Sequence, residues 1–310
     1  MIKINLSNDQ KRKIKNLVLE DAKEAETGIY KQLEKDEAKR CLEKYPELKS
    51  ILYTEDDDDT INESELNKIL FSPREVLVGY TQKIPPLNNS ESEDILEHVF
   101  KFDNFSTRRA AAEMLRIINT DVCPYCNRQY IFTVESGKVR AQLDHYYPKK
   151  TYPYLSLSVF NLIPCCSICN TSKSSLDTIK TPILYPYEDE FGYDIYFDIQ
   201  EHDIKVFQGA SEKFDIVVEN PKKIDEYKVE NHMEKLHLDE LYKKHKPYVK
   251  NLLKNKYVNS EERIHELART FPELFESEEE VRSILCMSPL KKDDWNTRVL
   301  SKLTYDIITH

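Results

Sequence analysis

The sequence is poor in glycine, has no long apolar run and has no excess of positive charge. Only five glycines occur in 310 residues, and no two have the spacing of a P-loop or a dinucleotide-binding loop. This scarcity argues against an ATPase or a Rossmann enzyme. No stretch of about 18 apolar residues is present, and the polar start MIKINLSNDQKRKIK has no apolar signal-peptide core. We therefore expect a cytoplasmic protein without membrane contact.

The charge is unevenly distributed along the chain. Lys and Arg total 45 against 55 Asp and Glu, a net charge of −10, so the chain as a whole repels phosphate. Residues 121–180 carry +3, which leaves −13 for the remainder. Basic residues alternate with tyrosines in this segment, a pattern that suits nucleic-acid contact. The candidate nucleic-acid-binding residues are Arg128, Arg140, Lys149, Lys150 and Lys173.

Hydrophobic periodicity predicts a mainly helical α+β protein in three parts. Residues 1–105 have apolar residues at helical spacing, and we expect an N-terminal helical region. Residues 106–182 form a cysteine- and tyrosine-rich central domain, which a helix over 107–118 enters. Residues 183–310 should hold a small antiparallel sheet, from the alternating runs YDIYFDI, DIKVF and FDIVV, followed by helices.

An acidic run at residues 55–59 interrupts the N-terminal helical pattern. A solvated acidic loop is the simpler interpretation. The alternative is an acidic element that shields a basic cleft or docks a partner.

The central domain contains two CxxC motifs, Cys123–Cys126 and Cys166–Cys169, separated by 39 residues. In the reducing cytosol disulfides are rare, and thiolates from two such pairs supply the four tetrahedral ligands that Zn²⁺ prefers. Four buried apolar cysteines are the alternative. Because four thiolates leave no open coordination position, the predicted zinc is structural.

Three cysteines remain outside these motifs. Cys165 adjoins Cys166, and the CxxC register selects Cys166 as the ligand, although Cys165 is the other possibility. Cys41 and Cys286 lie alone in helical segments and are expected in the core.

A set of polar residues lies between and just after the cysteine motifs. The run KVRAQL, which predicts a strand, leads into Asp144 and His145. Asn161 falls in a second short strand, and Asn170 and Lys173 lie on a helix that the second motif opens. The order is strand with Asp-His, long loop, strand with Asn, and helix with Asn.

This arrangement resembles the HNH endonuclease family, whose ββα-metal unit has the same order, over about residues 121–176. Asn170 occupies the position of the third letter, His, in the family's name. Two flanking stretches, LDELYKKHKPYV and LSKLTYDI, are similar to bacterial phage-defence HNH nucleases of the Septu type, which work beside an ATPase. The resemblance therefore implies an endonuclease acting on DNA, with a partner ATPase in anti-phage defence.

The residue types suggest a role for each member of the set. His145 is the candidate general base, because histidine exchanges protons near neutral pH. Asp144 and Asn170 offer hard oxygen ligands suited to catalytic Mg²⁺ or Mn²⁺. The resemblance implies that Asn161 orients His145, and Lys173 is expected near Asn170 on the helix surface, in reach of a phosphate.

Two other functions stay open at this point. The same site could cut RNA, for example a tRNA, because the active unit contacts a phosphate backbone and does not distinguish the sugar. Alternatively, the domain could be a zinc-knuckle module that binds nucleic acid without cutting it. Such a module needs the four cysteines but not Asp144, His145 or Asn170.

Overall fold

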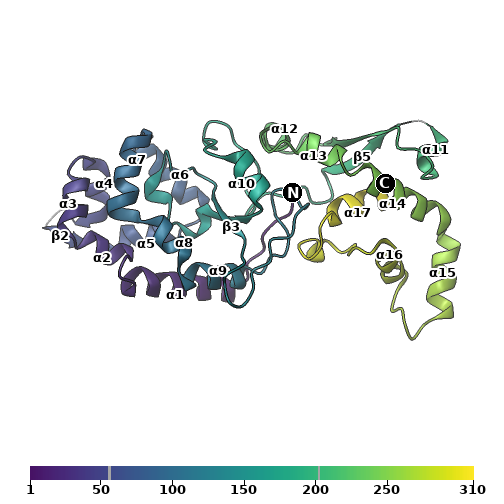
Figure 1. Cartoon of the computed structure of the whole chain (residues 1–310), viewed down its shortest axis with the longest axis horizontal. Helices are drawn as coiled ribbons and strands as arrows, with labels where there is room; N and C mark the ends of the chain where they lie inside the picture. Colours follow the sequence, from purple (N-terminus) through teal and green to yellow (C-terminus); the bar gives the residue numbers. More distant parts are fainter. Residues whose placement is uncertain (55–56, 202) are drawn as a thin grey trace. The chain divides into compact units, whose positions relative to one another are not determined.

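A computed structural model describes residues 1–54, 57–201 and 203–310, without the side chains of residues 57–59. The protein is mainly helical with small two-stranded antiparallel sheets, which confirms the α+β class (Figure 1). It divides into two compact units. The first unit contains Ile4–Thr120 and Ile131–Pro182, and the second contains Met1–Lys3, Asp121–Tyr130 and Ile183–His310. No helix in the described part is long and apolar enough to cross a membrane.

The first unit is built mostly from short helices. Helix α1 begins at a capping box, in which Ser7 and Gln10 satisfy each other's backbone N–H groups, and it buries Ile14 and Val18. It packs against α9, whose small alanines allow a close approach. The helices are α1 (Asn8–Glu24), α2 (Ile29–Leu33), α3 (Asp36–Leu42), α4 (Pro46–Leu52), α5 (Glu63–Phe71), α6 (Arg74–Lys83), α7 (Asn89–Ile95), the π-helical turn η1 (Leu96–Phe100), α8 (Phe102–Thr107) and α9 (Arg109–Ile118).

A hairpin interrupts these helices at the acidic run. Strand β1 (Tyr53–Thr54) pairs with β2 (Asp57–Ile61), so the backbone from residue 57 is a strand and the expected loop is wrong there. Residues 55 and 56 and the side chains of 57–59 lie outside the described residues. The hypothesis of an acidic shield or docking element concerns these side chains and therefore also lies outside the described residues.

A ββα element completes the first unit. Strand β3 (Gln142–His145) pairs antiparallel with β4 (Leu162–Cys165), and α10 (Ser167–Lys173) follows. Two 3₁₀ turns, η2 (Pro153–Leu155) and η3 (Val159–Asn161), lie in the connection. The strand begins later than the KVRAQL run predicted, because Lys138 and Val139 belong to a tight turn around Gly137, which has a φ of +68°.

The second unit contains the predicted small sheet, with β5 (Tyr196–Gln200) antiparallel to β6 (Asp215–Glu219). The run DIKVF is not a strand: it forms the one-turn helix α11 (Ile204–Phe207), which Asp203 caps by accepting from the Lys205 N–H. The remaining helices are α12 (Glu226–Lys235), α13 (Leu238–Lys243), α14 (Lys246–Val258), α15 (Glu261–Thr270), α16 (Glu278–Cys286), the 3₁₀ turn η4 (Lys292–Asp294) and α17 (Ser301–Thr309).

Candidate metal centre and candidate active site

Four buried cysteines form a cluster that fits a zinc ion. The sulfur atoms of Cys123, Cys126, Cys166 and Cys169 all lie within 4.8 Å of one another. Tetrahedral Zn–S bonds of about 2.3 Å place thiolates about 3.8 Å apart, so modest closure around an ion satisfies all four. Cys166, and not its neighbour Cys165 on β4, belongs to the cluster.

Backbone N–H groups support this donor set. The Arg128 N–H donates to Cys126 Sγ, and the Cys169 N–H donates to Cys166 Sγ, each at 3.4 Å. Such hydrogen bonds favour the charged thiolate over the thiol, which is the form that binds zinc. The cluster is therefore consistent with a structural Zn²⁺.

Polar contacts within the second unit hold the first cysteine motif in shape. The Tyr242 hydroxyl donates to the Cys126 carbonyl at 2.6 Å, and His232 Nε2 donates to the Tyr125 carbonyl at 2.8 Å. Asn127 adopts a left-handed φ of +50°, and its side-chain oxygen accepts from the Lys302 N–H. These groups orient the motif independently of any ion.

Asp144 lies on β3 and is neutralised by a lysine within the ββα element. Lys173 Nζ lies 3.2 Å from each carboxylate oxygen and donates to the His145 carbonyl at 2.5 Å. Both side chains are buried, Lys173 fully and Asp144 to 3% exposure. The expectation of a surface Lys173 is therefore wrong, because a buried carboxylate needs a compensating charge.

His145 ends β3 and is held as a neutral imidazole. Its Nε2 lies 3.0 Å from the Ser156 carbonyl, and because a carbonyl only accepts, Nε2 carries the proton. Burial, with a smaller contribution from the charge of Lys149, lowers the pKa of His145 to about 3. The other ring nitrogen, Nδ1, therefore carries the lone pair of the neutral ring.

The Asn161 side chain bonds to the loop beside His145 instead of to the imidazole. Its oxygen accepts from the Tyr147 N–H at 2.7 Å, and its amide nitrogen donates to the carbonyls of Tyr147 and Leu155. Leu155 precedes Ser156, whose carbonyl holds the imidazole. Asn161 is therefore connected to His145 through the backbone of this loop.

The pair Asp144 and Asn170, as arranged, does not fit a shared Mg²⁺ or Mn²⁺ ion. The Asn170 amide nitrogen donates to Gln142 at 2.8 Å, and both Asp144 oxygens face the Lys173 ammonium. An internal cation thus occupies the position where a divalent ion was expected.

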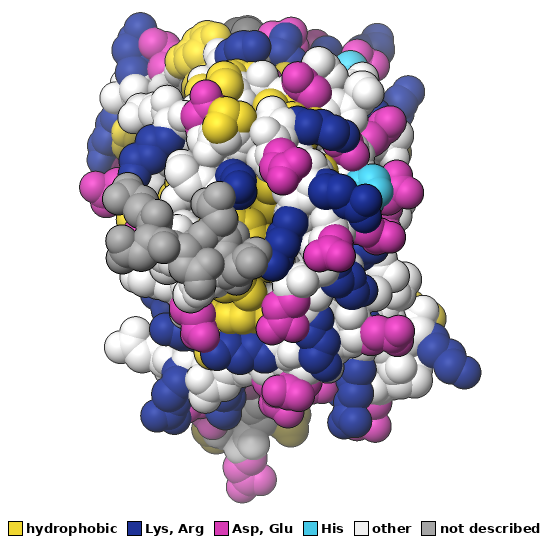
Figure 2. All heavy atoms as spheres, turned by 90° about the vertical axis from the view of Figure 1, so that its left-hand side faces the viewer, with side chains coloured by type: hydrophobic (Ala, Val, Ile, Leu, Met, Phe, Trp, Pro, Cys, Tyr) yellow, Lys and Arg dark blue, Asp and Glu magenta, His cyan; other side chains and the backbone are white. Residues whose placement is uncertain are grey.

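The predicted nucleic-acid-binding residues have different environments. Arg128 is half-buried and donates to His245 Nε2 at 2.9 Å, which ties it to the second unit's own packing. Arg140 is half-buried, Lys150 is exposed, and Lys149 pairs with Asp103 at 2.7 Å. In Figure 2, viewed from the side on which α3 and α4 lie in Figure 1, Lys and Arg side chains are interspersed with Asp and Glu.

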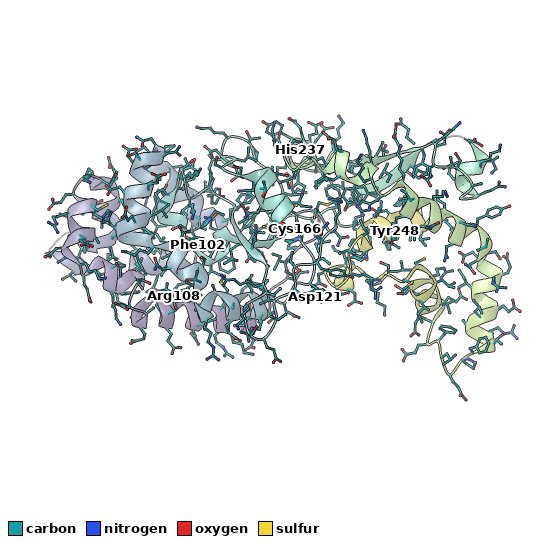
Figure 3. All side chains as sticks on the ribbon, in the orientation of Figure 1. Phe102, Arg108, Asp121, Cys166, His237 and Tyr248 are labelled. Atoms are coloured by element: carbon teal, nitrogen blue, oxygen red, sulfur yellow. The ribbon has the colours of Figure 1, made fainter. Side chains whose placement is uncertain are left out.

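Two groups at this site had no signal in the sequence. Phe102, labelled in Figure 3, lies at the start of α8 and packs edge-on against His145, with 4.2 Å between ring centroids. The Ser156 carbonyl is a backbone group, so no residue type marks its role. Both are found only once α8 and the 147–161 loop are placed around β3.

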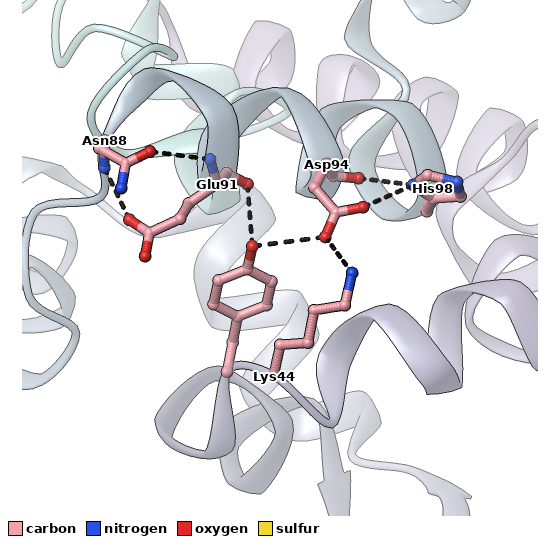
Figure 4. A network of polar contacts seen from close by, with 6 residues as sticks. Lys44, Asn88, Glu91, Asp94 and His98 are labelled. Atoms are coloured by element: carbon pink, nitrogen blue, oxygen red, sulfur yellow. Dashed lines mark hydrogen bonds and ion pairs between the residues drawn. The ribbon is translucent and has the colours of Figure 1, made fainter.

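A second group of potential metal ligands lies in the first unit, where Cys41, Asp94 and His98 offer atoms within 4.8 Å of one another. Asp94 already pairs with Lys44 at 2.9 Å and with His98 Nδ1 at 3.2 Å (Figure 4). Burial, followed by the Asp94 carboxylate, raises the pKa of the Cys41 thiol to about 12. The neutral thiol and the lysine make this a structural network between α3 and α7.

The fold and this site together define a ββα element in which the N-cap of the helix, Cys166, and Cys169 within the helix belong to a four-cysteine cluster. A curated protein with partial similarity is the Septu protein PtuB of Bacillus thuringiensis, 32% identical over 72 residues. The match covers 23% of this chain and 26% of that protein, so the aligned region spans about a quarter of the relative. No family model matches the chain, and no solved structure matches it.

Proposed function

We propose that the chain is an HNH-type endonuclease that hydrolyses phosphodiester bonds in DNA. The observation that carries the proposal is His145: a neutral imidazole at the end of β3, with its tautomer set by the Ser156 carbonyl, inside a ββα element. A general base must present a lone pair at working pH and is strongest when its pKa lies near that pH. Because burial lowers the pKa of free His145 to about 3, the proposal requires the negative charge of a bound phosphate to raise it again.

In this proposal His145 Nδ1 takes the proton from the attacking water, while the Nε2–H bond to Ser156 holds the ring in place. Asn161 keeps the loop that carries Ser156 fixed, since its three side-chain bonds join Tyr147 and Leu155. The buried Lys173 keeps the neighbouring Asp144 neutralised. Together these contacts give His145 one orientation.

We further propose that residues 106–182 are the nuclease domain and that the flanking regions, 1–105 and 183–310, serve a partner. The partial similarity to PtuB supports a role in a Septu-like phage-defence system. The glycine-poor chain has no P-loop spacing, so an ATP-driven step would belong to the partner ATPase.

A non-catalytic binding module is the second candidate, and one observation favours it. Lys173 occupies both oxygens of Asp144, which removes the expected acidic ligand from a catalytic metal site. A zinc-supported domain with basic residues binds a phosphate backbone without needing that ligand.

One experiment separates these functions. Purified protein is incubated with plasmid, linear DNA and total RNA, each in Mg²⁺, Mn²⁺ or EDTA, alongside the His145→Ala variant. The proposal expects DNA cleavage that His145→Ala abolishes with zinc content unchanged, and the cation arms establish the metal requirement. Cleavage of RNA alone supports the RNA alternative, and binding without cleavage supports the module.

A further inference from the structure

Lys149, Phe102 and Asp103 lie in a row next to His145. Lys149 Nζ lies 2.7 Å from Asp103 Oδ1 and 4.9 Å from the centroid of the Phe102 ring. The Phe102 ring in turn packs edge-on against the His145 imidazole. One ammonium group therefore holds both the carboxylate and the ring that covers the candidate base.

The ion pair between Lys149 and Asp103 is exposed to solvent. The Asp103 side chain is 87% exposed and that of Lys149 is 31% exposed. An exposed pair of this kind contributes little to stability, because water screens it and two side chains must be held in place. An anion from solution can therefore replace Asp103 at small cost.

A cavity of about 590 Å³ opens at this ion pair, between α7, η1, the start of α8 and the Lys149–Lys150 loop. Lys101 and Lys150 line it beside Lys149, and neither is in an ion pair within residues 1–54, 57–201 and 203–310. The carboxylates of Glu93, Glu97 and Asp103 also line it. Three ammonium groups and three carboxylates therefore line the cavity, and Asp103 is the carboxylate that pairs with Lys149.

We propose that Lys149 binds a phosphate of the DNA strand beside His145, and that Asp103 occupies this phosphate position in the free protein. Carboxylate and phosphate oxygens are equivalent partners for an ammonium group. When a phosphate binds to Lys149, two further lysines in the same cavity, Lys101 and Lys150, can bind the neighbouring phosphates. The proposal rests on the proposed function and adds an internal competitor of the substrate to it.

The test is equilibrium binding of a fluorescent DNA duplex to the zinc-loaded protein in buffer without Mg²⁺ or Mn²⁺, so that binding is measured without added cleavage cofactor. The proteins are wild type, Asp103→Asn, Lys149→Gln and the double variant. Asp194→Asn is the matched control, because Asp194 forms another exposed pair, with Lys222 at 2.6 Å, and the charge change is the same.

Asp103→Asn should bind about threefold tighter than Asp194→Asn, which is within the range for an exposed ion pair. The slope of log K against log salt concentration should become shallower by about 0.9 in Lys149→Gln, because one phosphate contact is lost. Lys149→Gln should bind more weakly, and adding Asp103→Asn to it should change nothing.

Equal affinity for Asp103→Asn and Asp194→Asn would overturn the proposal, and so would a gain from Asp103→Asn that persists without Lys149. Absence of binding in every protein would also overturn it. The proposed nuclease function fails on a different result, cleavage that does not depend on His145. The two failures are therefore distinguishable.

Discussion

Replacing Lys173 with methionine should destabilise the protein strongly, because it leaves the Asp144 carboxylate buried without a partner. Asp144 is only 3% exposed, and Lys173 Nζ lies 3.2 Å from each of its oxygens. Breaking a buried ion pair on one side typically costs about 3–5 kcal/mol. That cost corresponds to a folding equilibrium roughly 150- to 5,000-fold less favourable.

The assays are urea unfolding, which gives the free energy, and thermal unfolding, which gives the melting temperature, both followed by circular dichroism with zinc in excess. A cost of this size should lower the melting temperature by roughly 6–20 °C in a unit of this length. Lys180→Met is the matched control, because Lys180 pairs with Asp177 but is 73% exposed, and it should change stability by no more than about 1 kcal/mol.

A double variant tests the reasoning itself. Asp144→Asn combined with Lys173→Met removes both charges and should recover most of the lost unfolding free energy. The reason is that the destabilisation comes from a buried charge without a partner and not from a cavity. A Lys173→Met protein within about 1 kcal/mol of wild type would refute the buried pair. So would a double variant no more stable than Lys173→Met.

Three further predictions concern the cysteine cluster and the histidines. Cys166→Ser should release zinc, measured by elemental analysis, and unfold the segment around it, whereas Cys165→Ser should retain zinc; the reverse order would place the wrong cysteine in the cluster. The acid limb of kcat/KM for DNA cleavage should show no inflection near pH 6.5, because burial lowers the pKa of His145 to about 3 and the free protein keeps its base neutral; an inflection at pH 6.5 would contradict this. Burial also lowers the pKa of His232 to about 3, so its contribution to stability is complete above pH 6.5 and is lost as the pH falls toward 3. Between pH 6 and 4 the wild type should lose up to about 1.4 kcal/mol per pH unit more than His232→Gln, in unfolding curves, and equal slopes would exclude the histidine.

Much of the ββα element could be predicted from the sequence, because local rules decide it. The order strand, strand, helix follows from short apolar runs and from the second CxxC motif, whose Cys166 caps α10 by accepting from the Cys169 N–H. The zinc donor set followed from spacing alone, because thiolates in two CxxC motifs are the preferred ligands of this ion. The small sheet of the second unit followed from alternation in two of its three runs.

The third run shows where a local rule competes with another. DIKVF alternates like a strand, but Asp203 caps the Lys205 N–H and starts a helical turn, so the capping preference of aspartate prevails over the alternation. The KVRAQL run forms a strand only from Gln142 onward, because the turn around Gly137 takes its first residues.

Only the tertiary structure determines which groups contact one another in the candidate active site. Lys173 follows Asn170 by three residues on α10, and helical spacing suggested a surface position, yet packing of α10 on β3 brings its ammonium onto Asp144. Phe102 reaches His145 only because α8 packs near the end of β3. The acceptor for His145 Nε2 is a backbone carbonyl, which every residue type carries. A sequence records which side chains exist, but contacts between distant segments, and contacts to backbone atoms, depend on how the elements pack.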